Sequence, residues 1–481
     1  MRYLLILTLL LLSSPNAQTS GEPAAPPFDR ELHVYDLQDV WQGSAELANL
    51  PSYRLELSIA DDLRSLMGVQ TLSFTNTQDK LLDDALLRLY ANALGAELTV
   101  SQISVQGEEV TGTFEQNRTS LRVPLPQPLL PGERVELRLE FGLNISDSEV
   151  SYGRLAVFEA EAWAALNLAH GYPTLSVLDA SGWRGDLPDP SGDPLVAEAS
   201  LYEVRVTAPA DLQLAASGVI SERLLQADRQ VVTFTTAPVR DFYLAALRGY
   251  QLQSRLVDGV LVNSYAPSEL AGAAADSLSY AAQSLKRFSA FGTYPYRELD
   301  IVALPVSAGG IEYPGIIVLA NGIYRDAGTL ESVLAHEVAH QWAFNLVGSD
   351  QINEPWLDES LTQYLTSVYH DTYGGERFNQ GYLAYWQRAW SRSRNEDQAI
   401  GLDVAAYSPR DYSAIVYGKG LFFFRELEEE LGREILQAGL KTYFETYAWQ
   451  FAEPEDLQGV LEAACACDLS QTFGAWGASA D

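Results

Sequence analysis

Cysteine, positive charge and long apolar runs are all scarce in this chain. Among its 481 residues only Cys465 and Cys467 are cysteines, which excludes a disulfide framework as the basis of the fold. In the helix expected there, side chains two positions apart diverge, so two free or buried thiols are favoured over a bridge. A Cys-x-Cys metal site is favoured least.

The shortage of positive charge limits the possible partners. Lys and Arg number 31 against 64 Asp and Glu, which gives a formal net charge of -33. Such a polyanion is repelled by phosphate backbones and by anionic membrane surfaces. We therefore expect no nucleic-acid binding, and we interpret the acidity as a solvated surface rather than a specific acidic partner site.

The only marked apolar segment lies at the N-terminus. Arg2 precedes an apolar core at 4–12 and small polar residues at 13–17, the pattern of an export signal. We expect residues 1–17 to be a cleaved signal peptide, 18–27 a linker, and the mature chain to be secreted, periplasmic or at the cell surface. An uncleaved anchor is the minority alternative. No later stretch reaches the roughly 18 apolar residues of a membrane span, so none is expected after cleavage.

Hydrophobic periodicity divides the rest of the chain in two. Alternation with period two, as at Tyr53, Leu55, Leu57 and Ile59, recurs at 135–141 and 202–206 and indicates half-buried strands. Residues 28–252 are therefore predicted to form an antiparallel β-sandwich-like domain. From residue 253 to 481 the pattern predicts a mostly helical domain with a small sheet, with a helix over 268–291 and strands over 299–306 and 316–320. The fold class is multidomain α+β.

The sequence HEVAH at 336–340 carries the strongest functional signal. Residues four apart share one face of a helix, so His336 and His340 can bind one ion. Glu359 adds a carboxylate, and three such ligands are typical of a catalytic zinc that keeps one position open. Glu337 can then act as a base. Two histidines that merely pack on a helix are the alternative, although this spacing arises by chance only a few times in roughly a thousand such chains.

Helix signals around this motif suggest where its elements begin and end. Thr329 is a candidate N-cap for the metal helix, and Gly348 a candidate stop. Pro355 can open the next helix, because a residue without an N–H is tolerated in the first turn. The second helix would carry Glu359 inward on its first turns.

Four blocks of the second half resemble the aminopeptidase N family of zinc metallopeptidases, which are thermolysin-like gluzincins. HEVAHQW and the NLV at 345–347 resemble the family's metal helix, and NEPWLDES at 353–360 resembles the segment with its glutamate ligand. AGGIEYPG at 308–315 resembles the Gly-x-Met-Glu-Asn substrate motif, and YGKG at 417–420 the Tyr-x-Lys-Gly motif. The blocks also follow the family's order.

The resemblance implies a thermolysin-like catalytic domain and assigns catalytic roles. His336, His340 and Glu359 would hold one Zn²⁺ per chain. Glu337 would take a proton from the attacking water, and Tyr417 would stabilise the developing oxyanion. Bound zinc lowers the pKa of water to about 7, so a neighbouring carboxylate can act as a base at neutral pH.

The substrate motif implies an exopeptidase. Gly309 and Gly310 would let a peptide backbone approach closely, and Glu312 would pair with its free α-ammonium group. Tyr313 stands where the family has Asn, and Ala343-Phe344 stands where it has Phe-Gly. The first change keeps the amine anchor, but the resemblance then does not define the side-chain pocket or the backbone hydrogen bonds. The second change is expected to alter packing behind the metal helix without affecting the ligands.

These observations predict an exported zinc aminopeptidase that acts on peptide substrates. A zinc hydrolase of the same family that cleaves internally, or acts on a non-peptide, is the first alternative. A non-catalytic surface module is the second, although it would have no need to keep ligands, base and tyrosine together.

Overall fold

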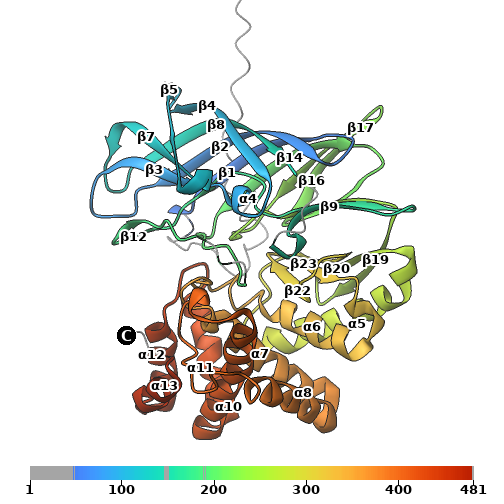
Figure 1. Cartoon of the computed structure of the whole chain (residues 1–481), viewed down its shortest axis with the longest axis vertical. Helices are drawn as coiled ribbons and strands as arrows, with labels where there is room; N and C mark the ends of the chain where they lie inside the picture. The colour runs from blue at the N-terminus through green and yellow to red at the C-terminus, as the bar shows by residue number, and fades with distance from the viewer. Residues whose placement is uncertain (1–46, 48, 146–150, 188, 190, 479–481) are drawn as a thin grey trace, which may run out of the picture.

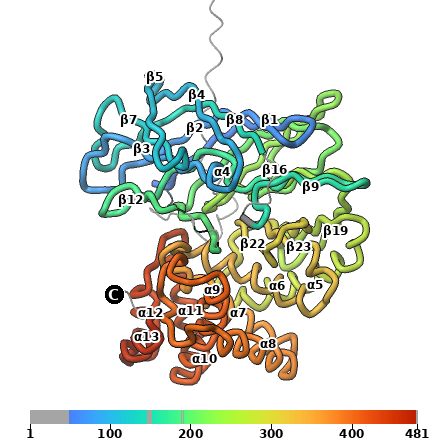
Figure 2. Tube along the Cα trace, in the orientation of Figure 1, coloured from blue at the N-terminus to red at the C-terminus, as the bar shows by residue number. Residues whose placement is uncertain are grey.

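A computed structural model describes residues 47, 49–145, 151–187, 189 and 191–478. The N-terminal half forms a β-rich domain, and the C-terminal half forms a domain with a small sheet and many helices (Figure 1). The two halves lie one above the other along the long axis of the molecule (Figure 2). The predicted multidomain α+β class is confirmed. The predicted signal peptide and linker lie outside the described residues.

An eight-stranded sheet is the largest layer of the β domain. Its strands run in the order β16-β17-β14-β1-β2-β8-β4-β5. Neighbours within it are antiparallel except β1 and β14, which pair in parallel. The predicted alternation is present, because Leu55, Leu57 and Ile59 are buried while Glu56 and Ser58 between them are exposed. The strands are β1 Ser52–Ile59, β2 Ser65–Thr75, β4 Glu97–Val105, β5 Glu108–Val110, β8 Arg134–Asn144, β14 Leu201–Pro209, β16 Val219–Gln226 and β17 Arg229–Thr235.

Two smaller sheets and a short hairpin complete this domain. One sheet has the order β15-β18-β10-β9, another the order β11-β3-β7-β6, and β12 pairs with β13. The strands are β3 Leu82–Arg88, β6 Thr113–Glu115, β7 Ser120–Leu129, β9 Leu155–Glu159, β10 Ala164–Leu168, β11 Thr174–Leu175, β12 Leu178–Asp179, β13 Gly182–Trp183, β15 Gln213–Ala216 and β18 Leu244–Arg248, with the short helix α4 at Tyr90–Ala93.

A five-stranded sheet of order β19-β20-β21-β23-β22 begins the C-terminal domain. Figure 1 shows helices α5 and α6 on the side of this sheet that faces away from the β domain. The predicted helix and strands of this region are present. The elements are β19 Tyr250–Val257, β20 Val260–Pro267, α5 Ala271–Phe288, β21 Glu298–Leu304, β22 Gly310–Tyr313, β23 Ile316–Ala320 and α6 Ala327–Ala339.

Helices make up most of the remaining chain. Two π-helical segments, His370–Gly374 and Ser413–Lys419, interrupt them. No helix of the described residues is both long and apolar enough to traverse a membrane. The helices are α7 Trp356–Tyr369, α8 Gly375–Trp390, α9 Pro409–Tyr412, α10 Gly420–Leu431, α11 Arg433–Thr446, α12 Pro454–Cys465 and α13 Ser470–Trp476.

The ends of the metal helix differ from the prediction. Asp326, not Thr329, caps α6, because its Oδ1 accepts a hydrogen bond from the Thr329 backbone N–H at 2.8 Å. The helix stops at Ala339, well before Gly348, and the chain turns back through Phe344 at a φ of 92°. The predicted role of Pro355 is confirmed, since it immediately precedes α7.

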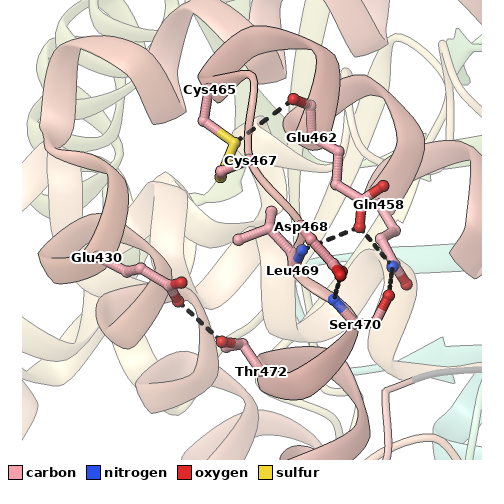
Figure 3. Close-up of a disulfide and its surroundings, with 9 residues drawn as sticks. All are labelled: Glu430, Gln458, Glu462, Cys465, Cys467, Asp468, Leu469, Ser470 and Thr472. Atoms are coloured by element: carbon pink, nitrogen blue, oxygen red, sulfur yellow. Dashed lines mark hydrogen bonds between the residues drawn. A yellow bond between two sulfur atoms is a disulfide. The ribbon is translucent and has the colours of Figure 1, made fainter.

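The prediction of free cysteines is wrong. Cys465 and Cys467 form a disulfide with their Cα atoms 5.2 Å apart (Figure 3). Helix α12 ends at Cys465, and Ala466 adopts a left-handed conformation with φ of 53° and ψ of 40°. The prediction assumed that the helix continues. The turn at Ala466 instead brings the two side chains together.

Candidate active site

His336, His340 and Glu359 converge at one point. The Nε2 atoms of the two histidines are 3.1 Å apart, and Glu359 Oε2 lies 3.2 Å from His336 Nε2 and 3.4 Å from His340 Nε2. A tetrahedral zinc with bonds of about 2.0–2.1 Å separates its ligand atoms by about 3.3–3.4 Å. Glu359 Oε2 is buried without a hydrogen-bond partner. The three side chains therefore fit one zinc ion, as predicted.

Two helices bring these ligands together. His336 lies in the last turn of α6, His340 directly follows that helix, and Glu359 lies in the first turn of α7. His340 Nδ1 lies 3.2 Å from the Ala343 carbonyl oxygen. When Nδ1 carries the proton and donates it to that carbonyl, the Nε2 lone pair is free for a metal.

The two histidines control the charge of Glu359. Burial alone raises the pKa of this carboxyl group, but His340 and His336 outweigh burial and hold the pKa below its ordinary value. Glu359 is therefore ionised across the neutral range, as a zinc ligand must be.

Glu337 occupies the position expected of a base. Its side chain is buried, and its Oε2 has no hydrogen-bond partner. One carboxylate oxygen each of Glu337 and Glu312 and a ring nitrogen of His340 lie within 4.8 Å of one another. Burial, and next the charge of Glu312, raises its pKa well above the ordinary value. A carboxylate of raised pKa is the stronger proton acceptor.

Gly310, at the start of β22, leaves space for the side chain of Glu337. A Cβ atom on Gly310 would lie 2.3 Å from Glu337 Oε1, whereas one on Gly309 would meet only Val333 methyl groups at 3.8 Å. The sequence predicted that both glycines admit a substrate backbone. For Gly310 the structure adds a second reason, since the missing side chain leaves space for the Glu337 carboxylate.

Tyr417 reaches the metal group from a π-helical segment. Its Oη donates a hydrogen bond to Glu359 Oε1 at 2.5 Å. Its ring lies between those of His336 and Trp386, with centroid distances of 5.9 and 6.1 Å and interplanar angles of 21°. The structure thus places the predicted phenol beside the metal ligands, with Trp386 of α8 behind it.

Glu312 lies on the edge strand β22 and faces the same space. It is 7% exposed, and its Oε1 accepts a hydrogen bond from Gln351 Nε2 at 3.1 Å. Burial, and next the charge of Asp193, raises its pKa to about 7. Asn345 Nδ2 donates to its backbone carbonyl at 2.9 Å, which ties the strand to the turn after α6.

Tyr313, which stands where the family motif has Asn, lies at the interface between the two domains. Successive strand residues point to opposite sides, and the Tyr313 ring stacks on Tyr243 of the β domain at 4.1 Å and 12°. Tyr313 is buried there. It therefore packs between the domains, away from the Glu312 carboxylate.

Sequence patterns gave no sign of two charged residues from the β domain. The carboxylate of Asp193 forms an ion pair with Arg154, and it contributes to the raised pKa values of Glu312, Glu337 and Tyr417. Both residues line a cavity of about 20 Å³ that also borders Glu312, enough for about one water molecule. No motif marks them, because only the folded chain brings them to the site.

A buried arginine joins the β domain to the turn after the metal helix. Arg240 donates hydrogen bonds to the carbonyl oxygens of Phe344 at 2.8 Å and Gln450 at 2.7 Å. A Cβ atom on Gly348 would lie 2.2 Å from its guanidinium carbon. This packing holds Phe344 in its left-handed conformation.

The comparisons with known proteins agree with this geometry. Residues 277–476 match the model of the peptidase family M1 domain. Aminopeptidase M1 of Arabidopsis thaliana is 26% identical over 306 residues, which cover 57% of this chain and 33% of that protein. Leukotriene A-4 hydrolase of Xenopus laevis is 26% identical over 448 residues, which cover 87% of this chain and 68% of that protein.

A solved structure shows the same fold over nearly the whole chain. The M1 zinc metallopeptidase of Deinococcus radiodurans has a TM-score of 0.66 and 21% identity, with 90% of this chain and 95% of that chain covered. The chain thus has the fold of that solved structure and a side-chain group that fits one zinc ion. The match over 277–476 gives the second half of the chain the pattern of a peptidase family M1 domain. The chain spans only about a third of the length of the Arabidopsis relative.

Proposed function

We propose that this chain is a zinc aminopeptidase that removes the N-terminal residue from peptides. The observation that carries the proposal is the grouping of Glu312, Glu337 and His340 within 4.8 Å beside the metal ligands. A carboxylate so close to the base can hold a substrate's α-ammonium group only if the bond to be cut lies one residue away.

The residues of the chain divide the reaction between them. Zinc held by His336, His340 and Glu359 would polarise the scissile carbonyl and acidify the attacking water. Glu337 accepts the proton of that water and passes it to the amine nitrogen as the C–N bond breaks. Tyr417 Oη, which donates to Glu359 Oε1 in the structure, would redirect its one hydrogen to the oxyanion, an interaction commonly worth about 3 kcal/mol. Glu312 and Asp193 supply negative charge for the ammonium group.

Two alternatives make different predictions. A hydrolase that cleaves internally, or acts on a non-peptide, would have no need of a buried carboxylate beside its base. A non-catalytic module would have no need of a metal group with a base and a phenol in contact. The aminopeptidase is therefore favoured over both.

Free and N-acetylated forms of one peptide, with and without a chelator, test the proposal. We expect the free peptide to lose its first residue, the acetylated form to be cut at least tenfold more slowly, and a chelator to abolish both reactions until Zn²⁺ is restored. Equal cleavage of the two forms would favour the endopeptidase. No metal-dependent cleavage of either would favour the module.

We also propose that the chain is exported. The signal pattern at 1–17 supports this, as does a disulfide of the kind that persists in oxidising compartments. Expression with and without residues 1–17, followed by fractionation, tests it. Retention of the full chain in the cytoplasm would contradict export.

A further inference from the structure

Gln351 connects the two carboxylates that flank the active site. Its Nε2 donates hydrogen bonds to Glu312 Oε1 at 3.1 Å and to Asp358 Oδ2 at 3.0 Å. All three side chains are buried, with exposures of 3%, 7% and 1% for Gln351, Glu312 and Asp358. Asp358 precedes the metal ligand Glu359 and accepts its backbone N–H at 2.7 Å. The Gln351 amide group thus binds both Glu312, the proposed amine-binding residue, and the first turn of α7.

The chemistry of this position requires an amide. The NH₂ group of glutamine has two hydrogens, and each satisfies one carboxylate. A carboxylate here would face two like charges, and an apolar side chain would leave both neighbours without a donor in a buried site.

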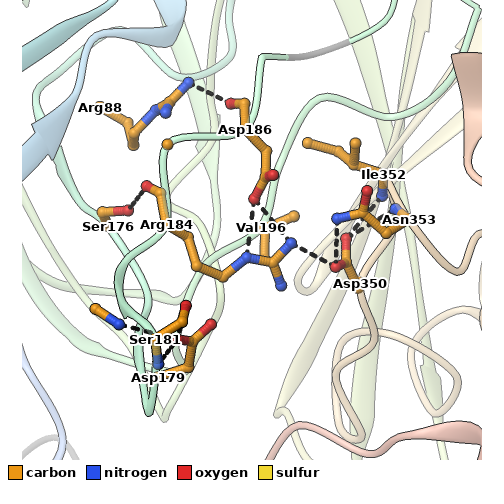
Figure 4. A network of polar contacts seen from close by, with 12 residues as sticks. Arg88, Ser176, Asp179, Ser181, Arg184, Asp186, Val196, Asp350, Ile352 and Asn353 are labelled. Atoms are coloured by element: carbon orange, nitrogen blue, oxygen red, sulfur yellow. Dashed lines mark hydrogen bonds and ion pairs between the residues drawn. The ribbon is translucent and has the colours of Figure 1, made fainter.

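The β domain fixes the loop that carries Gln351. Arg184 Nη2 binds Asp350 Oδ2 at 2.5 Å (Figure 4). Asp350 Oδ1 in turn accepts the backbone N–H groups of Ile352 at 3.1 Å and Asn353 at 3.0 Å.

An apolar contact reinforces this junction. Ile352 packs with Val177 and Val196 of the β domain in a small buried cluster. Gln351 therefore lies between two residues that the β domain holds directly, and its side chain has little freedom to turn away from Glu312.

We propose that Gln351 is a positioning residue for Glu312, and that the β domain controls recognition of the substrate amine through Arg184, Asp350 and Gln351. The inference rests on the proposed function, in which Glu312 binds the α-ammonium group. In this arrangement the domain interface sets how strongly the enzyme prefers a free N-terminus.

The test uses the full-length zinc-loaded chain and one peptide in free and N-acetylated form. Gln351→Met should raise KM for the free peptide about tenfold, the usual effect of losing a hydrogen bond to a charged group. Discrimination is the ratio of kcat/KM for the free peptide to kcat/KM for the acetylated peptide. This ratio should fall by the same factor, with kcat for the free peptide within about twofold of the wild type. Arg184→Met should act in the same direction by about two- to threefold, because its ion pair is partly exposed.

Gln230→Met is the matched control. Gln230 is also buried, and its Nε2 also donates twice, to the carbonyl oxygens of Pro209 at 3.0 Å and Leu212 at 2.7 Å. It lies in the β domain, in β17. This variant should lower the melting temperature without changing KM or the discrimination.

A Glu312→Gln variant separates the failure of this inference from that of the proposed function. If Glu312→Gln loses discrimination but Gln351→Met and Arg184→Met keep that of the wild type, the inference is overturned and the proposed function stands. Unchanged discrimination in Glu312→Gln would remove the amine-binding role itself and the inference with it. If Gln351→Met does not fold, Arg184→Met decides, and wild-type discrimination in that variant overturns the inference.

Discussion

Gln230 in the β domain and Glu337 in the catalytic domain are both almost fully buried polar side chains. The Gln230 amide donates both hydrogens to backbone carbonyls, and Asn76 in the same domain is held in a similar way. Glu337 has an oxygen without a partner and lies beside Glu312, a second carboxylate. Burying an unpaired charge costs stability. Gln230 and Asn76 therefore use buried polarity to fix the fold of the β domain, whereas Glu337 is buried unfavourably at a position that its chemistry needs.

Among the variants considered, Glu337→Gln should have the largest effect on catalysis. Loss of the base should reduce kcat by about a thousandfold or more, with zinc content unchanged because the ligands remain. Since a neutral amide replaces a buried carboxylate, the melting temperature should stay the same or rise. Peptide hydrolysis, metal analysis and thermal unfolding check these outcomes. Substantial remaining turnover would contradict the role of Glu337.

Gly310→Ala tests whether the space beside the base matters. The new methyl group would lie 2.3 Å from Glu337 Oε1 and must displace it. Misplacement of a catalytic group by about 1 Å can cost a factor of about a hundred, so kcat should fall by that order. Gly309→Ala, with its nearest contacts at 3.8 Å, should cost far less. Equal losses in the two variants would show that substrate approach, rather than Glu337, requires the glycines.

The raised pKa of Glu312 predicts a pH dependence of substrate binding. The carboxyl group must be ionised to bind an ammonium group, and its pKa is about 7. KM for a free peptide should therefore rise as pH falls below about 7, approaching tenfold per unit. In Glu312→Gln this acid limb should vanish while KM stays high. A KM that is flat from pH 8 to 5 in the wild type would refute the assignment.

The smallest effect concerns backbone strain at the domain junction. Phe344 has a φ of 92° and packs with Tyr90, Leu195 and Ala197. Both Phe344→Ala and Phe344→Gly lose that packing, but glycine accepts the left-handed conformation without strain. Phe344→Gly should therefore be more stable than Phe344→Ala by about 1 kcal/mol in denaturant unfolding. The reverse order would show that the turn rearranges in the variants.

Local patterns predicted what depends on local chemistry. Alternation located β1, β8 and β14, and the spacing of His336, His340 and Glu359 located the metal group. The end of α6 was missed because side-chain contacts and the turn at Phe344, rather than a glycine stop, end it.

Contacts between distant segments could not be predicted. Asp193, Arg154 and Gln351 act on the site through neighbours that no motif connects to them. The disulfide was missed because it depends on the left-handed conformation of Ala466. Glycine is the residue that usually indicates such a turn, and this position has alanine. A single sequence shows which residues carry chemistry more readily than which residues hold them in place.

The ring that Cys465 and Cys467 close contains one intervening residue, and so short a loop restricts the unfolded chain very little. Mild reductants should therefore leave the protein folded. Any activity lost in dithiothreitol would then report capture of the zinc by the added thiol, which makes the reductant a probe of metal affinity in a protein whose metal ligands include no cysteine.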